Sequence, residues 1–366
     1  MAVGVVMLGL GAGIGAALPR VANDLPPALA NVARVPERLW AQLVPPRVVK
    51  TARLAGLTGP ERAAVEALAK QVDGLLVWAS NRDGHHQLYL LDLRARAVRR
   101  LTSTPHVHFF PRFAPDGRTV VYMRSQREYV SFRDPLAWDL YLIHIDGTDE
   151  RRIVVGGGHP GWTADGRGIV FHRGPRMFRY DVEARQETLL FDAATELPGI
   201  DEDLGDAELA PDGRRLAFVL RGRFAGAHGL QGEVSGAAVF DLGTRQLTLL
   251  TREQACETTW APDGEHVVWM ETGGNGGTRV MIGRPDGSER QVFMDLPGPR
   301  SHEYFPRLSN DGRWLVWAAT DEGHEQDRAN YEIFVWKVGT PWDTAVQFTH
   351  HPGNSNWPDL WVRPRA

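Results

Sequence analysis

Five Asp-Gly pairs recur along this chain, each just before an apolar, strand-like run. Their Asp residues are Asp116, Asp165, Asp212, Asp263 and Asp311, so the intervals are 49, 47, 51 and 48 residues. In such a pair Gly accepts a positive φ and Asp bonds to nearby backbone, which favours a tight hairpin turn. A period near 50 residues is too long for most solenoid units and is typical of a four-stranded propeller blade. The repeat therefore predicts a β-propeller.

The number of blades follows from the strands that accompany these turns. A further copy, LLVWASNRDG, starts at Leu75 but has no first strand before it, whereas SNWPDLWV at 355–362 resembles the first strands at 109–115 and 304–310. A C-terminal strand that completes the first blade would leave no long free edge. The sequence thus predicts an all-β fold, a six-bladed β-propeller of four-stranded antiparallel blades closed by the C-terminal strand, with a short helical N-terminal leader.

The repeats resemble those of TolB-type proteins, whose propellers have WD40-like blades. The resemblance covers about residues 75–362 and rests on the Asp-Gly turns, on SNRDG at 80–84 and on Leu-Tyr third strands such as LYLLDL and LYLIHI. It implies the fold but not a function, because such blades occur in binding proteins, in lyases and before peptidase domains. In TolB a sizeable N-terminal domain precedes the propeller, whereas only about 55 residues lie here between the apolar start and the first blade, so the resemblance does not transfer the role of TolB.

Before the propeller the chain divides into two segments. Residues 1–19 hold no charged side chain and suit a signal peptide or a membrane anchor, which predicts a periplasmic protein or one anchored facing the exterior. The basic residues that follow leave a cytoplasmic orientation of an anchor open. Residues 20–73 form a Pro- and Arg-rich spacer that ends in a capped helix at about 59–73, where Thr58 and Glu61 form a capping box. The propeller then occupies 74–366.

Charge and motifs narrow the function. A net charge of -4 argues against a nucleic-acid partner. The chain has no G-x-S-x-G nucleophile elbow. We therefore expect a non-catalytic module that binds a protein or peptide partner, with the membrane as a further partner through residues 1–19.

Alignment of the blades on the turn Asp places six residues in equivalent positions of the first strand. Three are ionisable and three are aromatic: Phe110, His159, Asp206, Glu257, Phe305 and Trp357. Together with His302 and Glu303 they are predicted to bind a ligand at the mouth opposite the Asp-Gly turns, where the longer loops lie. In a second aligned position, Asp359 is expected to pair with both Arg112 and Arg307.

A divalent metal is the alternative use of these residues. His159, Asp206, Glu257 and His302 combine imidazole and carboxylate ligands, which would suit a metal-dependent lyase or hydrolase with its site in the channel. None of them has a short diagnostic spacing, and polar residues that solvate a channel explain the same pattern. The sequence leaves both interpretations open.

Overall fold

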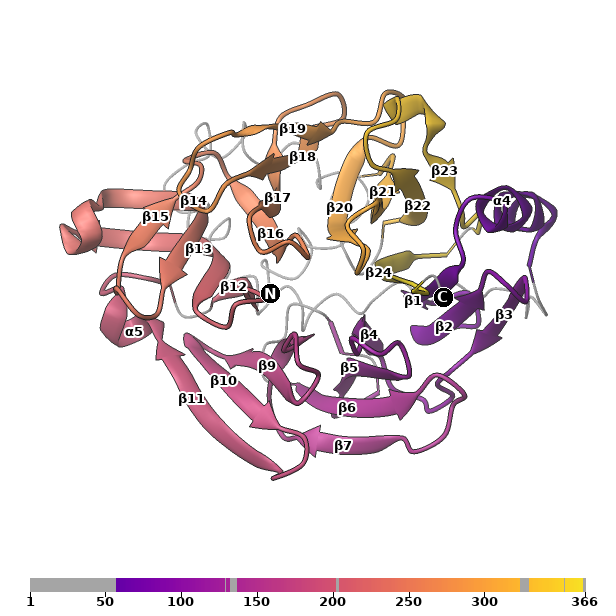
Figure 1. Ribbon diagram of the computed structural model, residues 1–366, viewed down its shortest axis with the longest axis horizontal. Coiled ribbons are helices and arrows are strands. Elements are labelled where there is room, and N and C mark those ends of the chain that lie inside the picture. Colours follow the sequence, from indigo (N-terminus) through magenta and orange to yellow (C-terminus); the bar gives the residue numbers. More distant parts are fainter. Residues whose placement is uncertain are drawn as a thin grey trace, which may run out of the picture.

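The computed structural model describes residues 57–128, 130–131, 137–201, 204–322, 329–351 and 353–364. The predicted leader at 1–19 and most of the spacer lie outside these residues. Six four-stranded antiparallel sheets surround a central channel (Figure 1). This arrangement confirms the predicted six-bladed propeller.

Within each sheet the strands are ordered from the channel outward, and the first blade takes its innermost strand from the C-terminus. Its strands are β24 (Ser355–Val362), β1 (Gly74–Ser80), β2 (Gln87–Asp92) and β3 (Ala97–Arg100). The second and third blades consist of β4 (His108–Phe113), β5 (Thr119–Ser125), β6 (Trp138–His144), β7 (Arg151–Val154), and of β8 (Gly158–Trp162), β9 (Gly168–Arg173), β10 (Arg176–Asp181), β11 (Gln186–Asp192).

The other three blades follow the same order. They consist of β12 (Gly205–Leu209), β13 (Arg215–Ala225), β14 (Gln231–Asp241), β15 (Leu247–Leu249); of β16 (Ala255–Trp260), β17 (Val267–Thr272), β18 (Thr278–Gly283), β19 (Gln291–Met294); and of β20 (His302–Leu308), β21 (Trp314–Thr320), β22 (Glu332–Lys337), β23 (Val346–Gln347). In the fourth blade, residues 221–236 between the second and third strands are largely strand, since β13 and β14 pair in register out to Ala225 and Gln231. Short helices are α5 (Ala193–Glu196), η1 (Ala227–Gly229) and η2 (Trp342–Thr344).

The Asp-Gly pairs form the expected turns between first and second strands. In the second blade, Oδ1 of Asp116 accepts a hydrogen bond from the backbone N–H of Arg118 at 2.9 Å, and Gly117 has a φ of 68°. The equivalent bond in the fourth blade joins Asp212 to Arg214 at 2.8 Å. The turn chemistry predicted from the sequence is therefore confirmed.

One aromatic side chain per blade forms the centre of the core. These residues lie in the second strands, almost all of them six positions after the turn Asp, and are essentially unexposed: Trp78, Tyr122, Phe171, Phe218, Trp269 and Trp317. A large aromatic side chain at this position buries much apolar surface between neighbouring blades. The regular repeat of this residue keeps the innermost strands at similar distances from the channel.

Closure of the ring depends on β24. It pairs antiparallel with β1 from Gly74–Val362 to Ser80–Ser355. Side chains also tie it to the neighbouring blades, because Nε1 of Trp361 donates to the carbonyl of Pro115 at 3.0 Å and Oδ1 of Asn310 accepts from the N–H of Val362 at 2.6 Å. The C-terminal strand thus contacts the first, second and sixth blades.

The helix before the propeller is α4 (Gly59–Ala69), which ends four residues before the predicted boundary because the chain must turn into β1. The capping box of Thr58 and Glu61 is present. The apolar side of α4, which includes Val65 and Leu68, is buried against the propeller beside β23 (Figure 1). Among the residues that the structure describes, no helix is long and apolar enough to cross a bilayer.

Candidate functional site

The six aligned residues share an unusual backbone conformation. Each has a positive φ between 41° and 59°: Phe110, His159, Asp206, Glu257, Phe305 and Trp357. At the same place the pairing of each innermost strand shifts by a bulge. Bulges re-aim a side chain, and a positive φ is costly for residues other than Gly. The strain is repeated in all six blades and directs these six side chains, called the ring below, toward the channel.

The aromatic half of the ring is tightly packed. The ring centroid of Trp357 lies 4.9 Å from that of Phe110 and 4.7 Å from that of Phe305, and Phe110 lies 4.3 Å from His159. All three aromatic side chains are buried. They pack against one another and also line the pocket described below.

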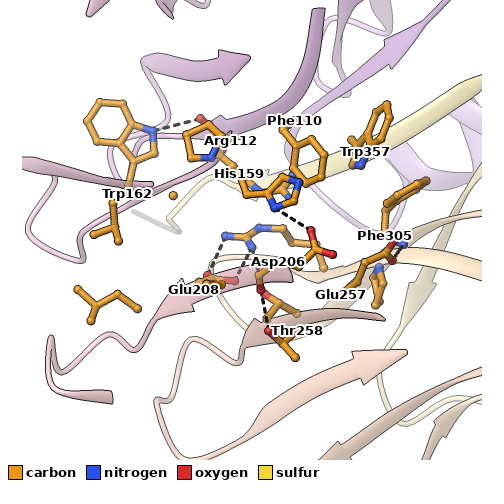
Figure 2. Close-up of a pocket in the computed structure, with 18 residues that line it drawn as sticks. Phe110, Arg112, His159, Trp162, Asp206, Glu208, Glu257, Thr258, Phe305 and Trp357 are labelled. Atoms are coloured by element: carbon orange, nitrogen blue, oxygen red, sulfur yellow. Dashed lines mark hydrogen bonds and ion pairs between the residues drawn. The ribbon is translucent and has the colours of Figure 1, made fainter. Parts of the chain in front are cut away.

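The ionisable half of the ring is more open. Nδ1 of His159 lies 3.2 Å from Oδ1 of Asp206 and 3.0 Å from Nε2 of His172, and the imidazole and carboxylate of the ion pair are both partly exposed (Figure 2). Thr258 donates from Oγ1 to the backbone carbonyl of Asp206 at 2.7 Å. His172, a buried residue of β9, is a member of this cluster that the sequence did not reveal, because it comes from a second strand.

Glu257 is the most buried ionisable residue of the ring, with 7% of its surface exposed. Its Oε2 accepts a hydrogen bond from the backbone N–H of Phe305, while Oε1 is buried and has no partner among the described residues. Burial, and after it the charge of Asp206, raise the pKa of Glu257 well above its usual range. The shift favours the protonated form of the side chain, and Oε1 has no hydrogen-bond partner among the described residues.

The second aligned position forms a charged layer next to the ring. Arg307 reaches across the channel from the sixth blade to the fourth, where Nη1 and Nη2 lie 2.9 and 3.1 Å from the two carboxylate oxygens of Glu208. Its Nε lies 3.5 Å from Oδ1 of Asp359, which also accepts from the N–H of Phe113 at 2.8 Å through Oδ2. The expected pairing of Arg307 with Asp359 is thus confirmed, and Glu208 is an additional partner.

Arg112 does not join this network. Its one hydrogen bond among the described residues runs from Nη1 to the carbonyl of Pro111 at 3.0 Å, and none of their carboxylates forms an ion pair with it. The guanidinium stacks over the ring of Phe110 at 5.5 Å. Burial, and then the charge of Arg307, lower the pKa of Arg112 to about 10. The expected pair between Arg112 and Asp359 is therefore wrong, because Arg307 takes that carboxylate.

A pocket lies between the ring and this charged layer. Apart from Val170, its lining consists of ring residues and of residues up to three places after them in the innermost strands, including Arg112, Trp162, Glu208, Thr259 and Arg307 (Figure 2). The pocket contains about 580 Å³ of space not filled by protein, part of it open to solvent. Since each Asp-Gly turn follows six residues after a ring residue, the pocket lies on the turn side of the ring. The prediction had assigned the ligand to the opposite, loop-bearing mouth.

Two predicted ligand-binding residues lie elsewhere. His302 and Glu303 do not line the pocket. Glu303 is wholly buried, where Oε1 accepts from the N–H of Leu296 at 2.7 Å and Oε2 lies 3.3 Å from Oγ1 of Thr278. Burial raises the pKa of this carboxyl to about 8. Its contacts join the fifth and sixth blades, so its role here is in packing.

The predicted metal ligands do not converge. Within the described ranges, no three His, Cys, Asp or Glu side chains are close enough together to hold a metal ion. Of the four candidates, His159 and Asp206 form an ion pair, Glu257 bonds to backbone and His302 lies outside the pocket. The donor set of the described residues therefore does not fit a metal site, and we derive no chemistry through one.

Comparison with known proteins identifies similar folds. No family model and no curated protein matches the chain. The solved structure of a putative TolB from Agrobacterium tumefaciens matches 80% of this chain and 98% of its own length, with a TM-score of 0.54 and 13% identity. TolB from Acinetobacter baumannii matches 81% of this chain and 85% of its own (TM-score 0.46, 13% identity), and an oligogalacturonate lyase in complex with manganese matches 77% and 73% (TM-score 0.47, 17% identity).

Identities this low support conclusions about the fold alone, and of these three the Agrobacterium structure is the one similar enough to carry them. The match covers nearly the whole length of that structure. The chain therefore has the six-bladed propeller fold of TolB-type proteins.

Proposed function

We propose that this chain is a non-catalytic binding propeller, which holds a protein or peptide partner through the pocket in its channel. The observation that carries the proposal is the ring itself. Six non-glycine residues with positive φ present an aromatic half and an ionisable half to one pocket. Strained backbone that is repeated around a pocket points to a functional site.

The charges in the pocket favour binding over catalysis. Asp206 is paired with His159, and Glu208 and Asp359 are paired with Arg307, so these three carboxylates are already engaged in ion pairs within the protein. Cys256 beside the ring is not a nucleophile either, since burial raises the pKa of its thiol to about 12. The metal-dependent lyase or hydrolase considered above has no comparable support from the described residues.

The cellular location that we propose is the periplasm, or the outer face of a membrane. It rests on the uncharged segment at 1–19, which suits a signal peptide or an anchor. Mass spectrometry of the protein from its source cells distinguishes the two, because an anchor keeps Met1 and a signal peptide does not. A full-length protein found in the cytoplasm without membrane association would contradict both.

Site-specific photocrosslinking tests the binding function. A photoreactive amino acid at Ala164, which is exposed in the turn of the third blade, should capture a partner in source cells, whereas the same residue at Glu253 on the loop side should not. The Ala164 crosslink should disappear in an Asp206→Ala background. Equal capture at both positions, capture that survives Asp206→Ala, or no capture at either position would refute binding through this pocket.

A further inference from the structure

Two polar groups at the pocket have hydrogen-bonding capacity that the described residues do not use. One is the guanidinium of Arg112, whose single bond goes to the carbonyl of the preceding residue. The other is Oε1 of Glu257, which is buried and without a partner. Both residues line the pocket, and they come from β4 and β16, in the second and fifth blades.

Unused groups of this kind are costly when nothing occupies the pocket. A buried charge is normally paired, and leaving one partnerless costs several kcal/mol at order of magnitude. The neighbouring charges are paired within the protein, since Arg307 binds two carboxylates and Asp206 binds His159. Arg112 is thus the guanidinium of the pocket that lacks a carboxylate, and Glu208, Asp359 and Asp206 are already engaged.

The unused hydrogen-bonding groups of Arg112 and Glu257 are both donors. A guanidinium has only N–H donors. Burial and the charge of Asp206 favour the protonated form of Glu257. Its Oε2 already accepts from the N–H of Phe305, so a proton on this carboxyl belongs on Oε1, from which it can be donated. A complementary ligand must therefore offer acceptors. Arginine pairs with planar carboxylates through two parallel hydrogen bonds, which makes a carboxylate the best match.

We propose that this pocket binds a carboxylate group, anchored by Arg112 and completed by Oε1 of Glu257, next to the aromatic half of the ring. The proposal rests on the binding function above and names the chemistry of its ligand. The carboxylate belongs either to a small aromatic or apolar acid or to a peptide, at its C-terminus or in an acidic side chain. Phe110, Phe305 and Trp357 offer an apolar contact beside the charge.

Three probes of similar shape and different charge test the ligand class on the full chain. Phenylacetate should bind in calorimetric titration, phenylacetamide should bind at least tenfold more weakly, and 2-phenylethylamine should not compete. Loss of a charge-assisted bond corresponds to about tenfold or more in affinity. Binding of the amine in preference to the acid, or failure of phenylacetate to bind, would overturn the proposal.

Variants then locate the site. Arg112→Gln should weaken phenylacetate at least tenfold, whereas Arg118→Gln, which removes an exposed arginine on the same side, should leave it unchanged. Arg112→Gln should also melt at the same temperature as the wild type or above, because it removes a partly buried charge that has no carboxylate partner among the described residues. If Arg112→Gln does not fold, Arg112→Lys tests the same role, since it keeps the charge but cannot form the two parallel hydrogen bonds to phenylacetate and should also bind it more weakly. Unchanged binding in a folded Arg112 variant would refute the assignment.

The pH profile tests Glu257 separately. Asp206 from β12, Arg112 from β4 and the thiol of Cys256 face or adjoin this carboxyl. Phenylacetate should bind more weakly as the pH rises and Glu257 loses its proton. Glu257→Gln carries a donor at every pH, so its affinity for phenylacetate should not show this decrease with rising pH. Identical pH profiles for the two proteins would exclude the role given to Oε1.

Peptides distinguish the possible sources of the carboxylate. Gly-Gly-Phe should compete with phenylacetate if a C-terminus is the ligand, whereas its C-terminal amide should not; N-acetyl-Asp amide reports an acidic side chain. Competition by none of the peptides would assign the site to small acids. In that case the crosslink at Ala164 should also be absent, which would refute the proposed protein partner but leave the carboxylate site supported. A crosslink at Ala164 without any carboxylate binding would refute the carboxylate site but leave the protein partner supported.

Discussion

At the level of single residues, this propeller contains several buried carboxyl groups with raised pKa values. Burial raises the pKa of Glu303 to about 8 and that of Glu332 to about 7, and Glu257 is shifted in the same direction. Each of them accepts hydrogen bonds from backbone N–H groups of neighbouring segments. These acids therefore connect segments of the fold while remaining neutral below their raised pKa values.

We predict that Glu303→Gln reduces the pH dependence of stability. Between the ordinary pKa of 4.5 and about 8 the folded protein retains a proton that the unfolded chain has released, so the free energy of unfolding falls as pH rises through this range. The slope from one such group is at most ~1.4 kcal/mol per pH unit. Urea unfolding at pH 5 and pH 8 measures it.

The variant should lose at least about 1 kcal/mol less than the wild type between these two pH values. Glu289→Gln, at an exposed position on the surface, is the control and should behave as the wild type. A wild-type stability that rises from pH 5 to pH 8, with the same increase in Glu303→Gln, would contradict the prediction.

At the scale of secondary-structure elements, α4 attaches to the propeller through one buried ion pair. Oε1 of Glu61 lies 2.8 Å from Nη2 of Arg82, and the two side chains are 0% and 3% exposed. Glu61 also accepts from the N–H of Thr58 at 2.8 Å and from that of His350 at 3.4 Å. Glu61 therefore links the first turn of the helix to the loop between β1 and β2 and to the segment that leads to β24.

Glu61→Ala should destabilise the protein by about 3 kcal/mol, because it leaves the buried Arg82 without this carboxylate and also removes the capping box. Glu66 on the same helix forms an exposed pair with Arg96 at 3.2 Å, and Glu66→Ala should cost at most about 0.5 kcal/mol. Denaturant unfolding of both variants tests the difference. Equal effects would mean that α4 contributes little to the closed propeller.

At the scale of the whole molecule, the ring of blades is held together by the C-terminal strand. The indole of Trp361 on β24 packs against the turn of the second blade, where a Cβ added to Gly117 would lie 2.4 Å from its ring atoms. Gly213 occupies the same turn in the fourth blade with a similar φ of 71°, and a Cβ there would meet nothing within 4 Å. The two glycines thus differ in their contact with the closing strand rather than in backbone conformation.

Gly213→Ala should cost about 1 kcal/mol, the usual penalty for a positive φ. Gly117→Ala should cost ~2 kcal/mol more, because the indole must move from its place at the closure. Trp361→Ala should remove this excess when combined with Gly117→Ala, which a double-mutant cycle in thermal unfolding can measure. A Gly117→Ala variant no less stable than Gly213→Ala would argue that Trp361 does not tighten the closure.

The sequence by itself determined the features that depend on local spacing. The Asp-Gly turns, the extra copy that starts at Leu75 and the strand-like run at 355–362 were sufficient for the number of blades and for their closure. The aligned positions of the ring also followed, and the Pro after Phe110, His159, Phe305 and Trp357 accompanies the common backbone conformation. Such patterns survive in the sequence because hairpin turns and alternation along a strand involve near neighbours in the chain.

Only the tertiary structure decided which of the aligned residues meet. Arg112 and Arg307 occupy equivalent positions, yet Arg307 binds Glu208 and Asp359 while Arg112 has no carboxylate partner, because these distances are set across the channel between blades. Glu303 lies two residues before the ring residue Phe305 in the same strand but is buried between blades, and the pocket lies on the turn side of the ring. Contacts between residues about 50 to 250 positions apart depend on the curvature of the closed ring, which no local spacing encodes.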